Sequence, residues 1–377
     1  MTTTLRTRTQ YDHALQALGV AISARIPVIL WSDPGQGKTS LIESAAASGW
    51  LVEPVVASYS EPSDFNGLPV VRPDSSVVLA PPAWAKRLAE HDGPSILFLD
   101  EFSTSPVSVQ NATLRMLTNH QVGALQLPET VAFVAASNPS DVSTGAFELS
   151  APAASRFIHL DFSMPFEVYA EGLITQKWPT LPVHDLSAEQ LAPFLDHEKV
   201  LVAGFLNARE SQLTAIPKNA ADRGRAFPTP RTWDYAARLS ALAKAIGAPT
   251  EVRQLLTAGV IGDVAAHEFL AWTALNDLPD PEVLLADPKA ASFADMRGDH
   301  VYVTLQGVLA AVSRNSTPAR WTAAIEVCAS AAGSGKSIDP AVPVVRTLLR
   351  PEHKPTGAAV PSSIKVFAPA LQLAGLL

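Results

Sequence analysis

Short apolar runs alternate with stretches of helical spacing over the first 165 residues of the chain. Apolar runs that predict buried strands lie at 26–31, 52–57, 95–99, 130–136 and 157–160, and helical spacing lies at 10–24, 40–47, 84–90 and 107–119. Pro54 limits the second strand to its later half or to an edge of the sheet. Residues 60–83 are rich in proline and predict loops or a short hairpin.

The pattern changes after about residue 165. Strand runs become rare, and alanine- and leucine-rich helical segments continue to the C-terminus. Strands that alternate with helices imply right-handed crossovers. We therefore predict an α/β fold with a parallel sheet, followed by an all-helical region.

Composition narrows the class of protein. The chain has 377 residues, of which 47% are hydrophobic and 17% charged, enough for two or three domains. Its net charge of −8 and the lack of a long basic block argue against nucleic acid as a partner. Cys328 is the single cysteine, no signal peptide is recognisable, and no apolar stretch is long enough to span a membrane. We expect a cytoplasmic protein that is not inserted in a membrane.

A glycine-rich segment joins the first predicted strand to the next helix. The segment has the residue types of a phosphate-binding loop, whose backbone N–H groups surround phosphate oxygens. Lys38 would reach the β- and γ-phosphates, and the Thr39 hydroxyl would coordinate Mg²⁺. An ordinary strand–turn–helix junction is the alternative. The candidate nucleotide-binding residues are Pro34, Gly35, Gln36, Gly37, Lys38, Thr39 and Ser40.

Ser32 stands where the full phosphate-loop pattern has its first glycine. Either the loop needs no positive φ at this position, or the loop is strained there. A second string of the same type, Gly333 to Ser337, serves as a control. A helix rather than a strand is predicted before it, and Pro340 and Pro343 leave no room for a regular helix beginning near Lys336. We interpret the second string as a loop.

Polar residues follow two of the predicted central strands. Asp100 and Glu101 end the strand at 95–99, where a parallel sheet binds ligands. Asp100 can hold Mg²⁺ beside Thr39, and Glu101 can polarise an attacking water. Asn138 follows the strand at 130–136 and could orient that water or touch the γ-phosphate. The alternatives are a solvated strand end for the acidic pair and turn chemistry for the Asn-Pro pair.

Two arginines are further candidates for contact with phosphate. Arg156 precedes the last strand and could neutralise charge at the site of a neighbouring subunit. Arg231 opens a helix, an unfavourable place for a cation, and could clamp the nucleotide from above. For both, a solvated surface arginine is the alternative.

Taken together, these segments resemble the MoxR-type AAA+ ATPases, of the branch related to dynein-like modules and often paired with von Willebrand A-domain proteins. The resembling segments cover about residues 15–165 and one later element, and they are residues 33–39, 62–69, 81–84, 98–102, 109–114, 135–139, 155–157 and 230–233. Ser32 and the region beyond about residue 280 depart from the family pattern.

The resemblance assigns a role to each candidate residue. It implies that Lys38 and Thr39 form the Walker A motif, and that Asp100 and Glu101 form the Walker B motif. It further implies that Asn138 is sensor 1, Arg156 the arginine finger and Arg231 sensor 2. Glu101, Asn138, Arg156 and Arg231 are thus the predicted catalytic residues, with Thr39 and Asp100 as metal ligands.

The predicted architecture is an α/β ATPase core at 1–165, a helical lid at 166–280 and a helical extension at 281–377. The resemblance implies ATP and Mg²⁺ as ligands and a homo-oligomeric ring, usually a hexamer, with nucleotide between subunits. The predicted function is chaperone-like remodelling of a protein client, for which a von Willebrand A-domain protein is one candidate. A nucleotide-gated assembly scaffold with negligible turnover is the alternative.

Overall fold

The computed structural model describes residues 5, 7–139, 148–274, 278–288, 292–333 and 338–373. Its contacts divide the chain into two units. The first comprises residues 1–191 and 212–267, and the second comprises 192–211 and 268–377. The predicted boundaries near 165 and 280 stay predictions.

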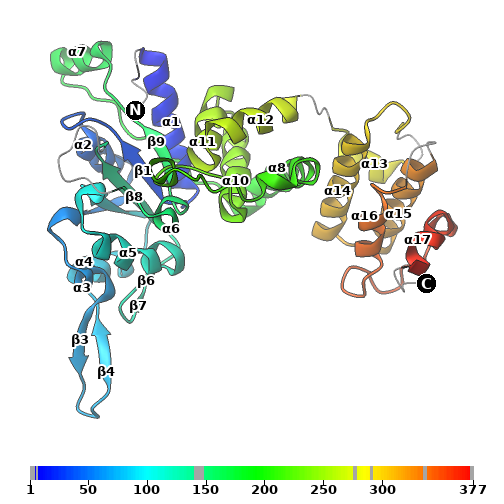
Figure 1. The fold of residues 1–377 in the computed structure, drawn as a ribbon, viewed down its shortest axis with the longest axis horizontal. Coiled ribbons are helices and arrows are strands. Elements are labelled where there is room, and N and C mark those ends of the chain that lie inside the picture. Colours follow the sequence, from blue (N-terminus) through cyan, green and yellow to red (C-terminus); the bar gives the residue numbers. More distant parts are fainter. Residues whose placement is uncertain are drawn as a thin grey trace. The chain divides into compact units, whose positions relative to one another are not determined.

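Five parallel strands form the sheet of the first unit, in the order β2-β5-β8-β1-β9 (Figure 1). They are β1 (Val28–Trp31), β2 (Leu51–Val56), β5 (Ser95–Asp100), β8 (Val131–Ser137) and β9 (Ile158–Asp161). The register places Val28 beside Val134 on one side and Ile158 on the other. All residues of β1 and β8 are buried, as their continuous apolar runs predict. β2, which contains Pro54, lies at the edge, where a missing N–H donor is tolerated.

Helices pack on the sheet through apolar residues. α4 (Ala83–Ala89) and α5 (Val107–Asn119) share one buried cluster with strand residues such as Ile29, Leu97 and Phe133. α1 (Arg8–Ser23) contacts β1, β8 and β9, and its first turn is closed by a capping box. α2 (Lys38–Glu43) follows β1 and passes into the 3₁₀ turn η1 (Ser44–Ser48).

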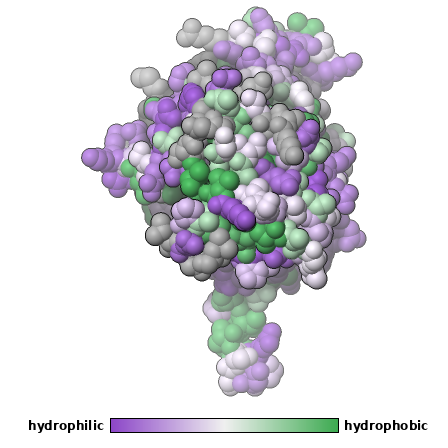
Figure 2. All heavy atoms as spheres, turned by 90° about the vertical axis from the view of Figure 1, so that its right-hand side faces the viewer, coloured by the Kyte–Doolittle hydropathy of each residue, from purple (hydrophilic) through white to green (hydrophobic). Residues whose placement is uncertain are grey.

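Two antiparallel hairpins and several short helices complete the strand-containing region. The hairpins are β3 (Leu68–Val71) with β4 (Val77–Ala80), and β6 (Gln121–Val122) with β7 (Leu125–Gln126). The short helices are α3 (Pro62–Asn66), η2 (Ala57–Tyr59), η3 (Phe102–Thr104) and α6 (Ala151–Ala154). The β3–β4 hairpin extends away from the sheet (Figure 1), and its exposed residues include Leu68, Val71 and Val77. Figure 2 shows hydrophobic residues along this projection.

After β9 the described residues form helices and connecting segments. These helices are α7 (Phe166–Thr175), α8 (Ala188–Ala208), η4 (Glu210–Gln212), α9 (Ala220–Arg223), α10 (Pro230–Ala245), α11 (Thr250–Ile261) and α12 (Asp263–Ala274). α10 begins with a capping box in which the Thr229 hydroxyl accepts from the Thr232 N–H, and Pro230 occupies the first turn. α11 packs on α10, α1 and β9. The predicted fold class, a parallel sheet followed by helices, is confirmed.

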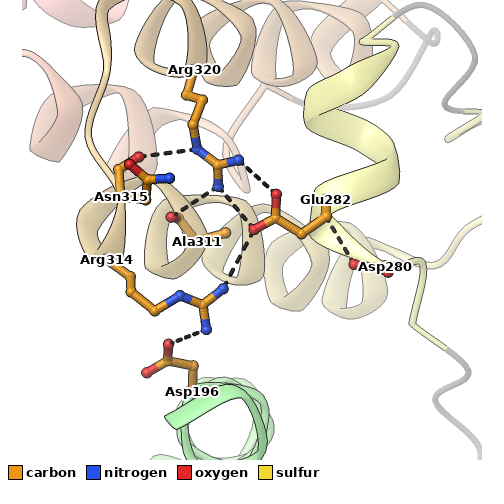
Figure 3. A network of polar contacts seen from close by, with 7 residues as sticks. All are labelled: Asp196, Asp280, Glu282, Ala311, Arg314, Asn315 and Arg320. Carbon is orange, nitrogen blue, oxygen red and sulfur yellow. Dashed lines mark hydrogen bonds and ion pairs between the residues drawn. The ribbon is translucent and has the colours of Figure 1, made fainter. Parts of the chain in front are cut away.

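The second unit has a core of its own. Its further helices are α13 (Pro281–Ala286), α14 (Gly298–Arg314), α15 (Pro318–Gly333), α16 (Val342–Leu348), η5 (Ser362–Phe367) and α17 (Ala368–Leu373). The core surrounds Trp321, which is fully buried and whose indole N–H donates to the Leu348 carbonyl at 2.8 Å. In a network on α13, α14 and α15, Glu282 accepts from Arg314 and Arg320, and Arg314 also pairs with Asp196 of α8 (Figure 3).

The second glycine-rich string begins where α15 ends, at Gly333, and its residues 334–337 lie outside the described residues. Among the helices built from described residues, none combines the length and apolar character needed to cross a lipid bilayer.

Candidate phosphate and metal site

The glycine-rich loop connects the carboxyl end of β1 to the start of α2. Gly35 and Gly37 have φ values of 76° and 78°, which residues with a Cβ rarely adopt. A Cβ added to Gly35 would meet nothing within 4 Å. The two glycines are therefore needed for the backbone conformation of the turn, and Gly35 is not needed to make room for a neighbouring group. The Gln36 carboxamide fixes the loop to the segment after β9 by accepting from the Met164 N–H at 2.8 Å.

The Lys38 ammonium lies at the centre of the site. It donates to Asn138 Oδ1 at 2.8 Å, to Ser32 Oγ at 2.9 Å and to the Ser32 carbonyl at 3.2 Å. Burial lowers the pKa of Lys38, although Asp100 and Asp33 attract its charge. All three N–H donors of the ammonium thus find acceptors within the protein.

Ser32 is buried and lies outside the left-handed region of φ. Of the two alternatives for this position, the loop follows the first, because no positive φ is required. The serine also adds an acceptor for Lys38 that a glycine could not supply. This role of the hydroxyl was not predicted from the sequence.

Thr39 and Asp100 bring two oxygen ligands together. The Thr39 hydroxyl donates to Asp100 Oδ2 at 3.0 Å, so that the start of α2 meets the end of β5. A hydroxyl and a carboxylate are hard oxygen donors of the kind that Mg²⁺ uses in nucleotide sites, where water and phosphate complete the shell. The donor set fits this metal. Among the described residues no group of three or more His, Cys, Asp or Glu forms a metal site by itself.

Glu101 is exposed and has a left-handed backbone conformation, with φ of 55°. Non-glycine residues in this conformation are concentrated at functional sites. Its carboxylate accepts a hydrogen bond from the Ser58 hydroxyl, which comes from η2 after the neighbouring strand β2. Ser58 is a further residue of the site that the sequence analysis missed. A serine just beyond the end of a strand beside β5 was the available signal.

Asn138 follows β8 and joins the same cluster through Lys38. Its backbone is also tied to the acidic segment, because the Ser103 hydroxyl donates to the Asn138 carbonyl at 3.2 Å. Ser103 lies two residues after Glu101. Hydrogen bonds therefore link the loop after β1, the end of β5 and the end of β8 at one edge of the sheet.

The two predicted phosphate-contacting arginines form a separate group. Arg156 donates to the Thr118 hydroxyl at 2.8 Å and to the Pro152 carbonyl, and Arg231 donates to the Ser155 hydroxyl at 3.2 Å. Burial and the neighbouring charge of Arg231 lower the pKa of Arg156. Among the described residues, neither arginine has a carboxylate within ion-pair distance.

A cavity of about 740 Å³ opens at the carboxyl end of β9. Its walls come from β9, α1, α11 and the segment before α10, and include Asp161, Arg225 and Phe227. Asp161 is the register partner of Trp31, the residue that precedes Ser32. Arg225 pairs with Asp161 at 3.2 Å and stacks on the Trp31 ring at 4.2 Å. The cavity is therefore next to the strand end from which the glycine-rich loop departs.

Comparison with known proteins finds no matching protein-family model and no matching curated protein. Among solved structures, the chain is similar to a candidate ATPase from Cytophaga hutchinsonii. The two share 15% sequence identity with a TM-score of 0.42, over 67% of this chain and 85% of that chain.

Proposed function

We propose that this chain binds ATP with Mg²⁺ and hydrolyses it at the carboxyl edge of the sheet. One observation carries the proposal. Residues predicted from separate motifs, namely Lys38, Thr39, Asp100 and Asn138, are joined by hydrogen bonds around one glycine-rich loop, and Glu101 directly follows Asp100. A structural strand–turn–helix junction has no need of this combination of ammonium, hydroxyl, carboxylates and amide.

Each residue has a role that follows from its contacts. Lys38 would leave Ser32 and Asn138 and donate to the phosphates, which are stronger acceptors than a hydroxyl or an amide. Thr39 and Asp100 would hold Mg²⁺. Bound there, the ion would neutralise phosphate charge. Glu101 would polarise the attacking water, and Asn138 would orient that water or the terminal phosphate.

The cavity beside β9 supports a nucleotide rather than a phosphate ion as ligand. Its volume of about 740 Å³ lies within the range of small-molecule sites. Phe227 and the aliphatic residues of α11 offer apolar walls for a base, and Asp161 and Arg225 offer polar groups. We assign the nucleoside of ATP to this cavity.

Arg156 and Arg231 support a shared site between copies of the chain. They lie beside each other and lack an acidic partner among the described residues. Two such cations are suited to an anion supplied by another molecule. We propose that both act on the nucleotide of the next copy in a ring, a head-to-tail arrangement that closes on itself. Remodelling of a protein client, such as a von Willebrand A-domain protein, is the function we propose for the ring.

The test separates binding from turnover. Lys38→Ala should abolish binding of a fluorescent ATP analogue, whereas Glu101→Gln should bind the analogue and hydrolyse ATP very slowly. Normal binding and turnover in Lys38→Ala would refute the site. Nucleotide-dependent assembly of the wild-type chain without turnover would instead favour the scaffold function.

The shared site has its own experiment. Arg156→Ala should keep ATP binding and lose turnover, on the order of 10³-fold for an arginine finger supplied in trans. Mixing Arg156→Ala with Lys38→Ala subunits should restore part of the activity, since some interfaces would combine an intact loop with an intact arginine. Stable mixed assemblies without any recovery would contradict a site shared between subunits.

A further inference from the structure

A buried histidine connects the strand before the glycine-rich loop to the segment that carries Arg156. His159 lies in β9 opposite Ile29, and Trp31 two residues along projects from the same face of the sheet. Only 8% of His159 is exposed. The imidazole and indole rings are nearly parallel, with an interplanar angle of 8°, and they meet edge to edge.

Two hydrogen bonds determine the state of this imidazole. The Trp31 indole N–H donates to His159 Nδ1 at 3.1 Å, and His159 Nε2 lies 3.0 Å from the Ala154 carbonyl. An indole nitrogen can only donate, and a carbonyl can only accept. His159 is therefore neutral, with its proton on Nε2, and Trp31 selects that tautomer.

The two bonds end at two functional segments. Trp31 is the last residue of β1 and is followed by Ser32, which accepts from Lys38. Ala154 is the last residue of α6, and Ser155 and Arg156 follow it. Ser155 in turn accepts from Arg231. One side chain thus bridges the strand that leads to the phosphate loop and the turn that holds both arginines.

Trp31 is also held from the cavity side. Arg225 stacks on its ring and pairs with Asp161, and both residues line the cavity assigned to the nucleoside. A ligand in that cavity would contact the groups that set the position of the indole. This arrangement provides a route by which the nucleotide site can influence the arginines.

We propose that His159 is a positioning residue that couples the phosphate loop of one copy to the Arg156 and Arg231 pair it presents to the next. The proposal rests on the function proposed above. His159 also lines the cavity assigned to the nucleoside, but both of its ring nitrogens are bonded within the protein, to Trp31 and Ala154. Its loss should therefore act mainly on the step that needs the arginines.

The test is a double-mutant cycle on turnover by the 377-residue chain. His159→Phe keeps a ring beside Trp31 and removes both hydrogen bonds. We expect a loss of turnover at saturating ATP on the order of tenfold. The dissociation constant for ATP is measured alongside, because His159 lines the cavity. In the Arg156→Ala background, His159→Phe should cause no further loss. A multiplicative loss in that background, or wild-type turnover in the single variant, would overturn the proposal.

Two conservative variants distinguish the two bonds and also serve if His159→Phe does not fold. His159→Gln can place an amide N–H near the position of Nε2, and His159→Asn can place an acceptor near Nδ1. Coupling through Ala154 requires more turnover in the glutamine variant than in the asparagine variant. The reverse order would refute it. If wild-type turnover is absent or does not depend on Arg156, the proposed function itself fails; if turnover depends on Arg156 and the cycle is multiplicative, only the role of His159 fails.

Discussion

The environment of His159 predicts how the stability of the first unit depends on pH. Burial, the largest cause, and the nearby charge of Arg225 lower the pKa of His159 from 6.5 to about 4, while its bond to the Ala154 carbonyl opposes this shift. Asp161 lies on β9, the strand that also carries His159, and its carboxylate pairs with Arg225. In the unfolded chain, His159 takes up a proton near pH 6.5, whereas in the folded chain it takes up that proton only near pH 4.

The sign and size of the effect follow from this difference. Stability from His159 is fully present above about pH 6.5 and is lost as the pH falls to about 4, because the unfolded state binds the proton first. At about 1.4 kcal/mol per pH unit, this loss amounts to roughly 3 kcal/mol. A variant without the imidazole lacks this pH-dependent contribution to the free energy of unfolding.

Comparing His159→Phe with the wild-type chain isolates the contribution of the imidazole, because all other titratable groups are present in both proteins. The variant should be less stable at pH 7, by about 1–3 kcal/mol for each buried partner left unpaired. The difference in the free energy of unfolding between the two proteins should then narrow by roughly 3 kcal/mol from pH 7 to pH 4. Hydrogen exchange of the β1 and β9 amides measures this free energy for the first unit.

A titration of His159 followed by NMR provides the direct check. The imidazole should keep its proton on Nε2 and show no titration between about pH 5 and 8. A pKa near 6.5, or a difference in stability between the two proteins that stays constant over the acidic range, would show that burial does not keep this histidine neutral.

Three further predictions follow from individual contacts. Ser32→Gly removes one acceptor from Lys38 but relieves no positive φ, so ATP affinity and turnover should change less than about tenfold, equivalent to 1.4 kcal/mol; a larger gain in ATPase efficiency would contradict the unstrained loop. Ser58→Ala frees the Glu101 carboxylate and should change turnover while leaving the affinity for ATP unaltered; a changed Kd with constant turnover is the opposing result. Trp321→Ala should destabilise the second unit by about 3–5 kcal/mol in calorimetry, because this indole is fully buried. If the variant instead shows one unfolding transition that shifts as a whole, the two units do not unfold separately.

Much of the phosphate site could be predicted from local sequence. Lys38 and Thr39 follow one buried strand, Asp100 and Glu101 end another, and Asn138 follows a third. Parallel strands present their carboxyl ends at one edge, so residues that follow these strands must come together once the sheet forms. The pattern of buried strands therefore already contained the essentials of the site.

Contacts between segments that are far apart in the sequence could not be predicted in this way. Arg231 lies beside Ser155 and Arg156, 75 residues or so earlier in the chain, and its expected place above the nucleotide stays a prediction. Likewise α8 belongs partly to the second unit, where a Cβ on Gly204 would collide with Val303 of α14. Neither pairing leaves a periodic or motif signal in the sequence.

Local patterns thus specified the strands, the glycine-rich turn and the residue types at the strand ends, because dihedral preferences and apolar periodicity act over a few residues. Tertiary packing decided the rest. It fixed which acceptors hold Lys38, placed the two arginines together, and buried His159 between Trp31 and Ala154. These features depend on side chains that meet across the fold, where burial and hydrogen-bond geometry, rather than position in the sequence, determine the chemistry of each group.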